Sequence, residues 1–155
     1  MSSATKARDQ RHHQNGVTLI ELMVVVLIVG LLLVLMLPAY QGQVRKAGRT
    51  VAQAELFRLL ARQEEFFVNN RQYAAAFNDL GMTADTAYRI DDGGAQVATG
   101  GIYLITLLME VSGRGFSLSA TPVGSQALDT VCGTLQVTST GIKSATGPGQ
   151  ATQCW

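Results

Sequence analysis

A single carboxylate interrupts the most apolar stretch of the chain. Glu21 is the one charged residue between Val17 and Leu37, and no histidine lies there either. A carboxylate inside a membrane-spanning segment costs about 2.5–3.5 kcal/mol, so it calls for a partner or a function. A cut between Gly16 and Val17 would create an ammonium group on Val17 and supply that partner. A glutamate tolerated near the membrane interface is the alternative.

The two cysteines are the next residues able to do chemistry. Cys132 and Cys154 show no C-x-x-C spacing, and the histidines, His12 and His13, are at the other end of the chain, which argues against a zinc site. Two cysteines downstream of a membrane-targeting segment are expected to form a disulfide on the oxidising side of the membrane, worth about 3 kcal/mol. Two buried free thiols are the alternative.

The common catalytic arrangements are missing from the sequence. With no histidine after His13, neither a Ser-His-Asp nor a Cys-His arrangement can form in the C-terminal part, and phosphate-loop and zinc-protease motifs are absent. Asp91 and Asp92 lack the regularly spaced oxygen ligands of a calcium loop and are interpreted as a solvated turn. We therefore predict a protein that is not an enzyme and that holds no cofactor and no metal.

Composition divides the chain into parts. It has 155 residues, about one domain, and only 15% of them are charged, against about 25% in ordinary soluble proteins. Residues 1–16 are polar and are interpreted as a cytoplasmic tail. Residues 17–38 are long and apolar enough to cross a bilayer as a helix. An ordinary secretory signal is the alternative, but its apolar region is only about 7–15 residues long.

The remainder, residues 39–155, is predicted to form an α+β head. An amphipathic helix is expected over 39–70, continuing the first helix through a bend at Pro38. An irregular connector over 71–100 and an antiparallel sheet of about four strands within 101–155 should follow. The helix face expected to cover the sheet carries apolar residues at steps of three, four or seven: Val44, Ala47, Val51, Ala54, Phe57, Leu60 and Phe67.

The segment that runs from Gly16 through Val17 and Glu21 to Leu22, reading GVTLIEL, resembles the class III signal of type IV prepilins. Further stretches are similar to PilE-like type IV pilins, namely Gln63 to Phe67, Asn70 to Tyr73, Leu80-Gly81, Cys132 to Leu135, Thr140 to Lys143, and Cys154-Trp155. The resemblance implies the type IV pilin fold, a long kinked N-terminal helix packed on a C-terminal antiparallel sheet.

The resemblance also assigns roles to residues. It implies cleavage between Gly16 and Val17 by a prepilin peptidase, which removes residues 1–16 as a leader, with N-methylation of Val17, although the family usually has phenylalanine there. It places Thr18, Glu21, Gly30 and Pro38 in assembly. It also implies a loop closed by a Cys132–Cys154 disulfide.

The implied function is that of a structural subunit of a type IV pilus, serving adhesion, twitching motility or DNA uptake. Its partners would be other pilins, the prepilin peptidase, the inner-membrane assembly platform and, before assembly, membrane lipid. The head would be periplasmic at first and extracellular in the filament. The alternatives are a minor or tip pilin that binds DNA or a surface, and a type II secretion pseudopilin.

DNA binding by the head is predicted to be weak or absent. Residues 41–155 carry nine basic and nine acidic side chains, so few phosphates can be neutralised at once. Lys143 and Arg114 are the only basic residues after position 100. Trp155, Tyr103 and Phe116 are better explained by core packing than by a binding surface.

Overall fold

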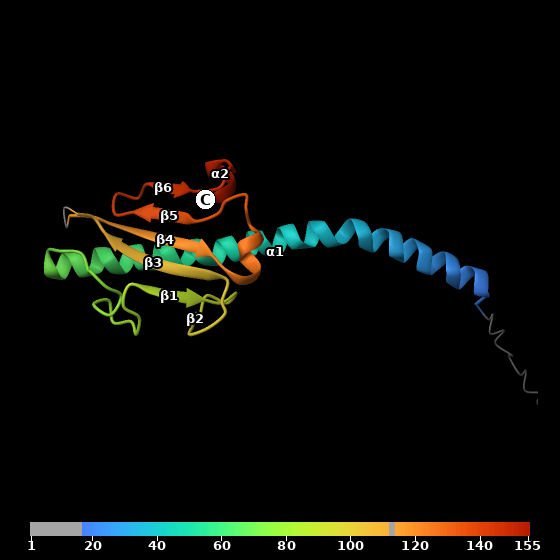
Figure 1. The fold of residues 1–155 in the computed structure, drawn as a ribbon, viewed down its shortest axis with the longest axis horizontal. Helices are drawn as coiled ribbons and strands as arrows, with labels where there is room; N and C mark the ends of the chain where they lie inside the picture. Colours follow the sequence, from blue (N-terminus) through green and yellow to red (C-terminus); the bar gives the residue numbers. More distant parts are fainter. Residues whose placement is uncertain (1–16, 112–113) are drawn as a thin grey trace, which may run out of the picture. The chain divides into compact units, whose positions relative to one another are not determined.

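The computed structural model describes residues 17–111 and 114–155, without the side chains of Pro38 and Ala39. It falls into two compact units, one that ends at Tyr40 and one from Gln41 to Trp155. The longest element, helix α1 (Leu19–Asn70), has 52 residues and belongs to both units (Figure 1). Its end at Asn70 confirms the predicted helix stop.

The first unit is one exposed apolar helical segment. Large side chains from Leu19 to Leu37 are roughly half to four-fifths exposed, and none of them is buried. This is the one described helix that is long and apolar enough to cross a membrane. An apolar surface of this extent requires lipid or other protein around it.

The second unit is a six-stranded antiparallel sheet packed on the C-terminal part of α1 (Figure 1). The strand order is β2-β1-β3-β4-β5-β6. The strands are β1 (Ala87–Ile90), β2 (Gln96–Val97), β3 (Tyr103–Met109), β4 (Phe116–Pro122), β5 (Leu135–Thr138) and β6 (Lys143–Ala145). A 3-10 helix, η1 (Gly124–Leu128), follows β4, and a short helix, α2 (Ala151–Cys154), ends the chain.

The α+β class and the antiparallel sheet are confirmed, but the sheet has two more strands than the predicted four. Both extra strands come from the 71–100 segment, which we expected to be irregular. β1 has only four residues and β2 only two, so neither is long enough to show a clear alternation in sequence. These strands are instead defined by their pairing in the sheet. Ile90 of β1 lies opposite Tyr103 of β3, and Arg89 of β1 lies opposite Val97 of β2.

The predicted helix face was wrong by about one residue. The fully buried apolar side chains of α1 in the head are Ala52, Leu56 and Leu59, whereas Phe57 is 40% exposed. Leu56 and Leu59 pack with buried residues from the central strands, among them Leu118 on β4. The apolar pattern misled because the true face also includes polar positions that are buried with partners.

Gln63 shows how a polar residue can occupy that buried face. It is fully buried one turn after Leu59. Its amide nitrogen donates to the Ala74 carbonyl at 3.0 Å, and its amide oxygen accepts from the Ala74 N–H at 2.9 Å. Because both ends of the amide are bonded, its burial carries no penalty from unmade hydrogen bonds. Gln63 thereby holds the connector against α1.

Candidate functional site

The start of α1 is organised by Thr18. Its side-chain oxygen accepts from the Glu21 N–H at 3.3 Å, and its carbonyl accepts from the Leu22 N–H at 3.2 Å. Thr18 is therefore the residue that caps the helix, with Glu21 in the first turn, which is the Ser/Thr-x-x-Glu pattern of helix starts. A carboxylate in the first turn is also favoured by the helix dipole. The predicted assembly residue Thr18 has a local structural role beside any role between subunits.

Glu21 has no ion-pair partner among the described residues. From Leu19 to Leu37 it is the only ionisable side chain, and its neighbours are exposed apolar groups. Gly16, on the leader side of the predicted cleavage bond, lies outside the described residues, while Val17 is described and 72% exposed. The carboxylate is thus presented on an apolar helix, and no described residue neutralises it.

Gly30 lies in the middle of the apolar part of α1. A Cβ atom built there would meet no described atom within 4 Å. Packing within this chain therefore does not require glycine. Small residues let helix backbones approach closely in apolar surroundings, so a requirement for Gly30 would come from another helix. The side chain of the remaining predicted assembly residue, Pro38, lies outside the described part of the chain.

The predicted disulfide between Cys132 and Cys154 is present, with a Cα–Cα distance of 5.4 Å. Two side chains of α1 hold the same C-terminal segment. Arg49 donates to the Gln153 carbonyl at 3.1 Å, and Gln53 donates to the Cys154 carbonyl at 2.8 Å. The C-terminus is therefore fastened to α1 as well as to the loop that carries Cys132.

Arg49 also makes an ion pair, which is the most buried one found among the described residues. Its Nε lies 2.6 Å from Asp129 Oδ2, with side-chain exposures of 11% and 1%. The other carboxylate oxygen of Asp129 is buried without a hydrogen-bond partner among the described protein groups. No pattern in the sequence indicated this pair, because its members are 80 positions apart and Asp129 resembles any loop aspartate.

Gln126 of η1 connects this ion pair to the core. Its Nε2 donates to the Arg45 carbonyl at 2.9 Å and to the Tyr103 hydroxyl at 3.1 Å. Burial raises the pKa of Tyr103 to about 12. Gly48 makes room for this amide, since a Cβ there would lie 2.6 Å from Gln126 Oε1. One glycine on α1 thus allows η1 to approach the helix.

A second ionic cluster joins α1 to β1. Arg58 makes two hydrogen bonds to the carboxylate of the buried Glu55, at 2.7 and 2.5 Å, and the Tyr88 hydroxyl donates to the same carboxylate. Burial, followed by the Glu55 hydrogen bond, raises the pKa of Tyr88. The hydrogen bond to Glu55 raises the pKa of Arg58. No pattern in the sequence indicated this cluster either, because Tyr88 is 33 positions from Glu55.

Comparison with known protein families identifies the family of this chain. Residues 38–136 match the profile described as "Type IV minor pilin ComP, DNA uptake sequence receptor", and residues 11–37 match the prokaryotic N-terminal methylation motif. The chain belongs to the ComP family of type IV minor pilins. No curated protein matches the chain.

A solved type IV pilin from Shewanella oneidensis has a similar fold. The TM-score is 0.50 and the identity 23%, over 72% of this chain and 97% of that one. At this identity the likeness supports the fold alone. This likeness and the family match confirm the predicted type IV pilin fold. The family match also confirms the role of a pilus subunit and places the chain with minor pilins rather than with secretion pseudopilins.

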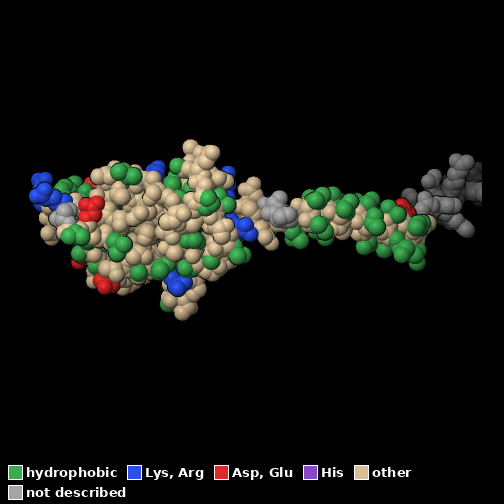
Figure 2. All heavy atoms as spheres, turned by 45° about the horizontal axis from the view of Figure 1, so that its top comes forward, with side chains coloured by type: hydrophobic (Ala, Val, Ile, Leu, Met, Phe, Trp, Pro, Cys, Tyr) green, Lys and Arg blue, Asp and Glu red, His purple; other side chains and the backbone are tan. Residues whose placement is uncertain are grey.

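Two basic side chains of the head are paired with carboxylates, Arg49 with Asp129 and Arg58 with Glu55. The other cations are spread over the head, and the face drawn in Figure 2 shows scattered basic and acidic side chains rather than one basic stripe. A dense electrostatic footprint of the kind common in nucleic-acid binders is therefore absent from the described face.

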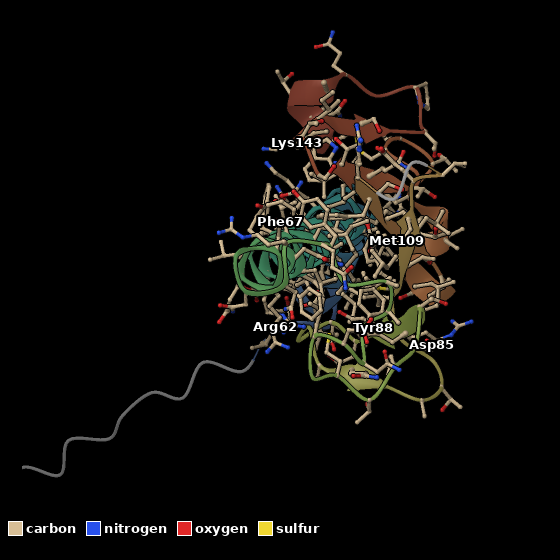
Figure 3. The ribbon with its side chains drawn as sticks, turned by 90° about the vertical axis from the view of Figure 1, so that its left-hand side faces the viewer. Arg62, Phe67, Asp85, Tyr88, Met109 and Lys143 are labelled. Carbon is tan, nitrogen blue, oxygen red and sulfur yellow. A yellow bond between two sulfur atoms is a disulfide. The ribbon has the colours of Figure 1, made fainter. Side chains whose placement is uncertain are left out.

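Lys143 is a basic residue of the head that lies beside aromatic rings. Its Nζ is 4.7 Å from the centroid of Phe57 and 5.6 Å from that of Trp155. Figure 3 shows Lys143 on the opposite side of the head from Tyr88. Tyr103 and Phe116 are fully buried, as expected, and Trp155 is partly buried and packs against the same core cluster. Lys143, Phe57 and Trp155 form a surface patch.

Proposed function

We propose that this pilin is cut between Gly16 and Val17 by a prepilin peptidase and then built into a pilus through its N-terminal helix. Before assembly, residues 17–38 hold it in the inner membrane with the head in the periplasm. Pairing of Glu21 with the new ammonium group at Val17 of a neighbouring subunit would guide docking. The observation that carries the proposal is Glu21, which has no ion-pair partner among the described residues and lies on an otherwise apolar exposed helix.

The processing step is tested by mass spectrometry of purified filaments. We expect an N-terminus at Val17, with or without one added methyl group. A filament subunit that still begins at Met1, or one that begins near Tyr40 as after removal of a secretory signal, would contradict the proposal. A Gly16→Val variant should remain uncut and stay in the membrane.

We infer a second function, contact between the head and DNA. The match of residues 38–136 to a DNA uptake sequence receptor family supports it. The ion pairs of Arg49 and Arg58 support the sequence-based prediction that such contact is weak, since a cation held by a carboxylate contributes less to phosphate binding. The Lys143 patch is the most suitable surface, because it combines a cation with aromatic rings.

A salt titration of duplex DNA binding by the full chain tests this second function. Non-specific contact should show a Kd of about 10⁻⁴–10⁻⁶ M and fade as salt increases. Lys143→Ala should weaken it more than the matched change Lys46→Ala. Sub-micromolar affinity retained at physiological salt would contradict the prediction of weak binding and indicate a dedicated receptor.

A further inference from the structure

A groove lies at the end of the head where α1 ends. One hollow of about 390 Å³ lies between the last turns of α1 and the loop that follows, and its lining includes Arg62, Glu65, Phe66 and Asp79. A second hollow of about 290 Å³ shares Phe66 and Asp79. We call the two together the distal groove. Its size is within the range of about 300–1,000 Å³ of small-molecule sites.

The charges around the distal groove favour a cation. Glu65 makes no ion pair within the described residues, and Asp79 uses only Oδ2, which accepts from the Ala76 N–H at 3.1 Å. The guanidinium of Arg62 donates to the Leu80 carbonyl at 3.2 Å, so it is directed at the backbone of the loop. The lining therefore carries two carboxylates and one guanidinium, so negative charge is in excess.

The end of α1 adds to this field. The last carbonyls of a helix carry a partial negative charge. The turn after Asn70 is closed by the Arg71 N–H, which donates to the Phe67 carbonyl at 2.8 Å, and the Asn70 side chain donates to the Phe66 carbonyl at 3.0 Å. The groove thus lies beside the negative end of the helix dipole and is unsuited to a phosphate.

The lining also contains an aromatic side chain. Among the described residues, no three side chains of His, Cys, Asp or Glu come together as a metal site. Phe66 instead supplies an aromatic ring to both hollows. Aromatic faces attract ammonium groups, and carboxylates pair with them, so the combination fits an organic ammonium rather than an inorganic cation.

We propose that the distal groove binds a ligand that bears primary ammonium groups on an extended polar chain, with an ammonium between Glu65 and Asp79 and the adjoining carbons along Phe66. A deacetylated amino-sugar polymer and a linear polyamine both carry this chemistry. Such binding goes beyond pilus assembly and beyond contact with DNA, because the groove repels the phosphates that a DNA site attracts.

The proposal is tested by titration calorimetry on the full chain in an uncharged polyoxyethylene detergent, which offers neither sugar nor ammonium to the groove. The probes are a glucosamine tetramer, its fully N-acetylated counterpart and spermidine. We expect binding of at least one of the two amines, weakened by salt, and no binding of the acetylated tetramer. If only spermidine binds, the source is a polyamine; if only the glucosamine tetramer binds, it is an amino sugar.

The variants Glu65→Gln and Asp79→Asn keep the shape of the groove, and the amide introduced by the second change retains an oxygen for the Ala76 N–H. Together they should lower affinity by roughly tenfold or more, because hydrogen bonds to charged groups are lost. Asp92→Asn, which changes an exposed carboxylate elsewhere on the head, is the matched control and should leave the affinity unchanged. Phe66→Leu should weaken binding without changing the melting curve.

Three outcomes would overturn the proposal. The first is that neither the glucosamine tetramer nor spermidine binds. The second is that the acetylated tetramer binds as tightly as the glucosamine tetramer, and the third is that the double variant binds the amines as tightly as the unchanged protein. None of them bears on processing at Val17 or on assembly through Glu21, so this inference and the proposed function fail separately.

Discussion

The two parts of helix α1 use charge in opposite ways. From residue 41 to residue 70 the helix carries many ionisable groups, and the most buried of them are neutralised inside the head, as Arg49 is by Asp129 and Glu55 by Arg58 and Tyr88. From residue 19 to residue 37 there is one ionisable group, Glu21, without a partner among the described residues. The charged groups that are paired inside the head help to hold α1 against the sheet. Glu21, on an apolar helix and without a partner among the described residues, indicates a partner in another molecule.

The largest effect should follow from Glu21→Val. Removing the carboxylate from the apolar helix should make membrane insertion easier and leave cleavage intact, but should abolish incorporation into filaments, because two apolar helices lose the pair that sets their register. Immunoblots of sheared filaments and of membranes measure both steps. Glu21→Asp, which keeps the charge, is the control and should retain part of the incorporation. Normal incorporation of Glu21→Val would contradict the proposed pairing.

Within the head, the largest loss is expected from Arg49→Met. The substitution leaves Asp129 buried without its cation and should lower the free energy of unfolding by about 3–5 kcal/mol. Arg45→Met, on the same helix but in an exposed hydrogen bond only, should change stability by less than about 0.5 kcal/mol. Denaturant unfolding of the full chain in detergent measures both. Equal losses of stability in the two variants would show that the burial of the Arg49–Asp129 ion pair does not determine its contribution to stability.

Replacing Cys132 and Cys154 together by serine removes a cross-link between residues 22 positions apart. The expected loss is about 3 kcal/mol in the chain-entropy model. The contacts of Arg49 and Gln53 with the C-terminal segment should keep part of α2 in place. Hydrogen exchange of residues 150–155 checks this, because complete loss of protection would show that the disulfide alone holds the segment.

Alkaline pH should weaken the head through its buried tyrosines. The pKa of Tyr103 in the folded chain is about 12, above its ordinary value of 10.0, so the stability linked to its protonated form is complete below pH 10.0 and is lost as pH rises towards 12. Tyr88 has a raised pKa for the same first cause, burial. Phenolate absorbance followed together with unfolding should show both tyrosines ionising late. Early ionisation in the folded protein would contradict their burial.

The smallest expected effect concerns the end of α1. Arg71 is the one described non-glycine residue with positive φ, at 58°. Glycine adopts this conformation without steric cost and is preferred after helix ends. Arg71→Gly should therefore raise stability by less than about 1 kcal/mol, partly offset by greater freedom of the unfolded chain. A measurable loss of stability would mean that the exposed arginine side chain makes a contribution of its own.

The features that could be predicted from the sequence are those with a local pattern, and the features that could not are contacts formed only in the folded head. The apolar helix, its end at Asn70, the hairpin of β3 and β4, and the disulfide all depend on strong local patterns or on a motif. The orientation of α1 against the sheet could not be obtained in this way, because Gln63 and Glu55 are buried with partners and so break the apolar pattern. Strands of two and four residues have no periodicity to detect, and Arg49 meets Asp129 only in the folded chain.

The final residue has a consequence for how neighbouring heads behave. β6 is the last strand on its side of the sheet, and the unpaired backbone groups of such a strand can recruit a strand from another molecule. The indole N–H of Trp155 donates to the Ser144 carbonyl at 2.9 Å, and α2 packs beside the same strand. A protein concentrated in a membrane and then in a fibre must avoid pairing its sheets by accident. Trp155 and α2 cover part of this border of the sheet, which favours association through the apolar helix over pairing at β6.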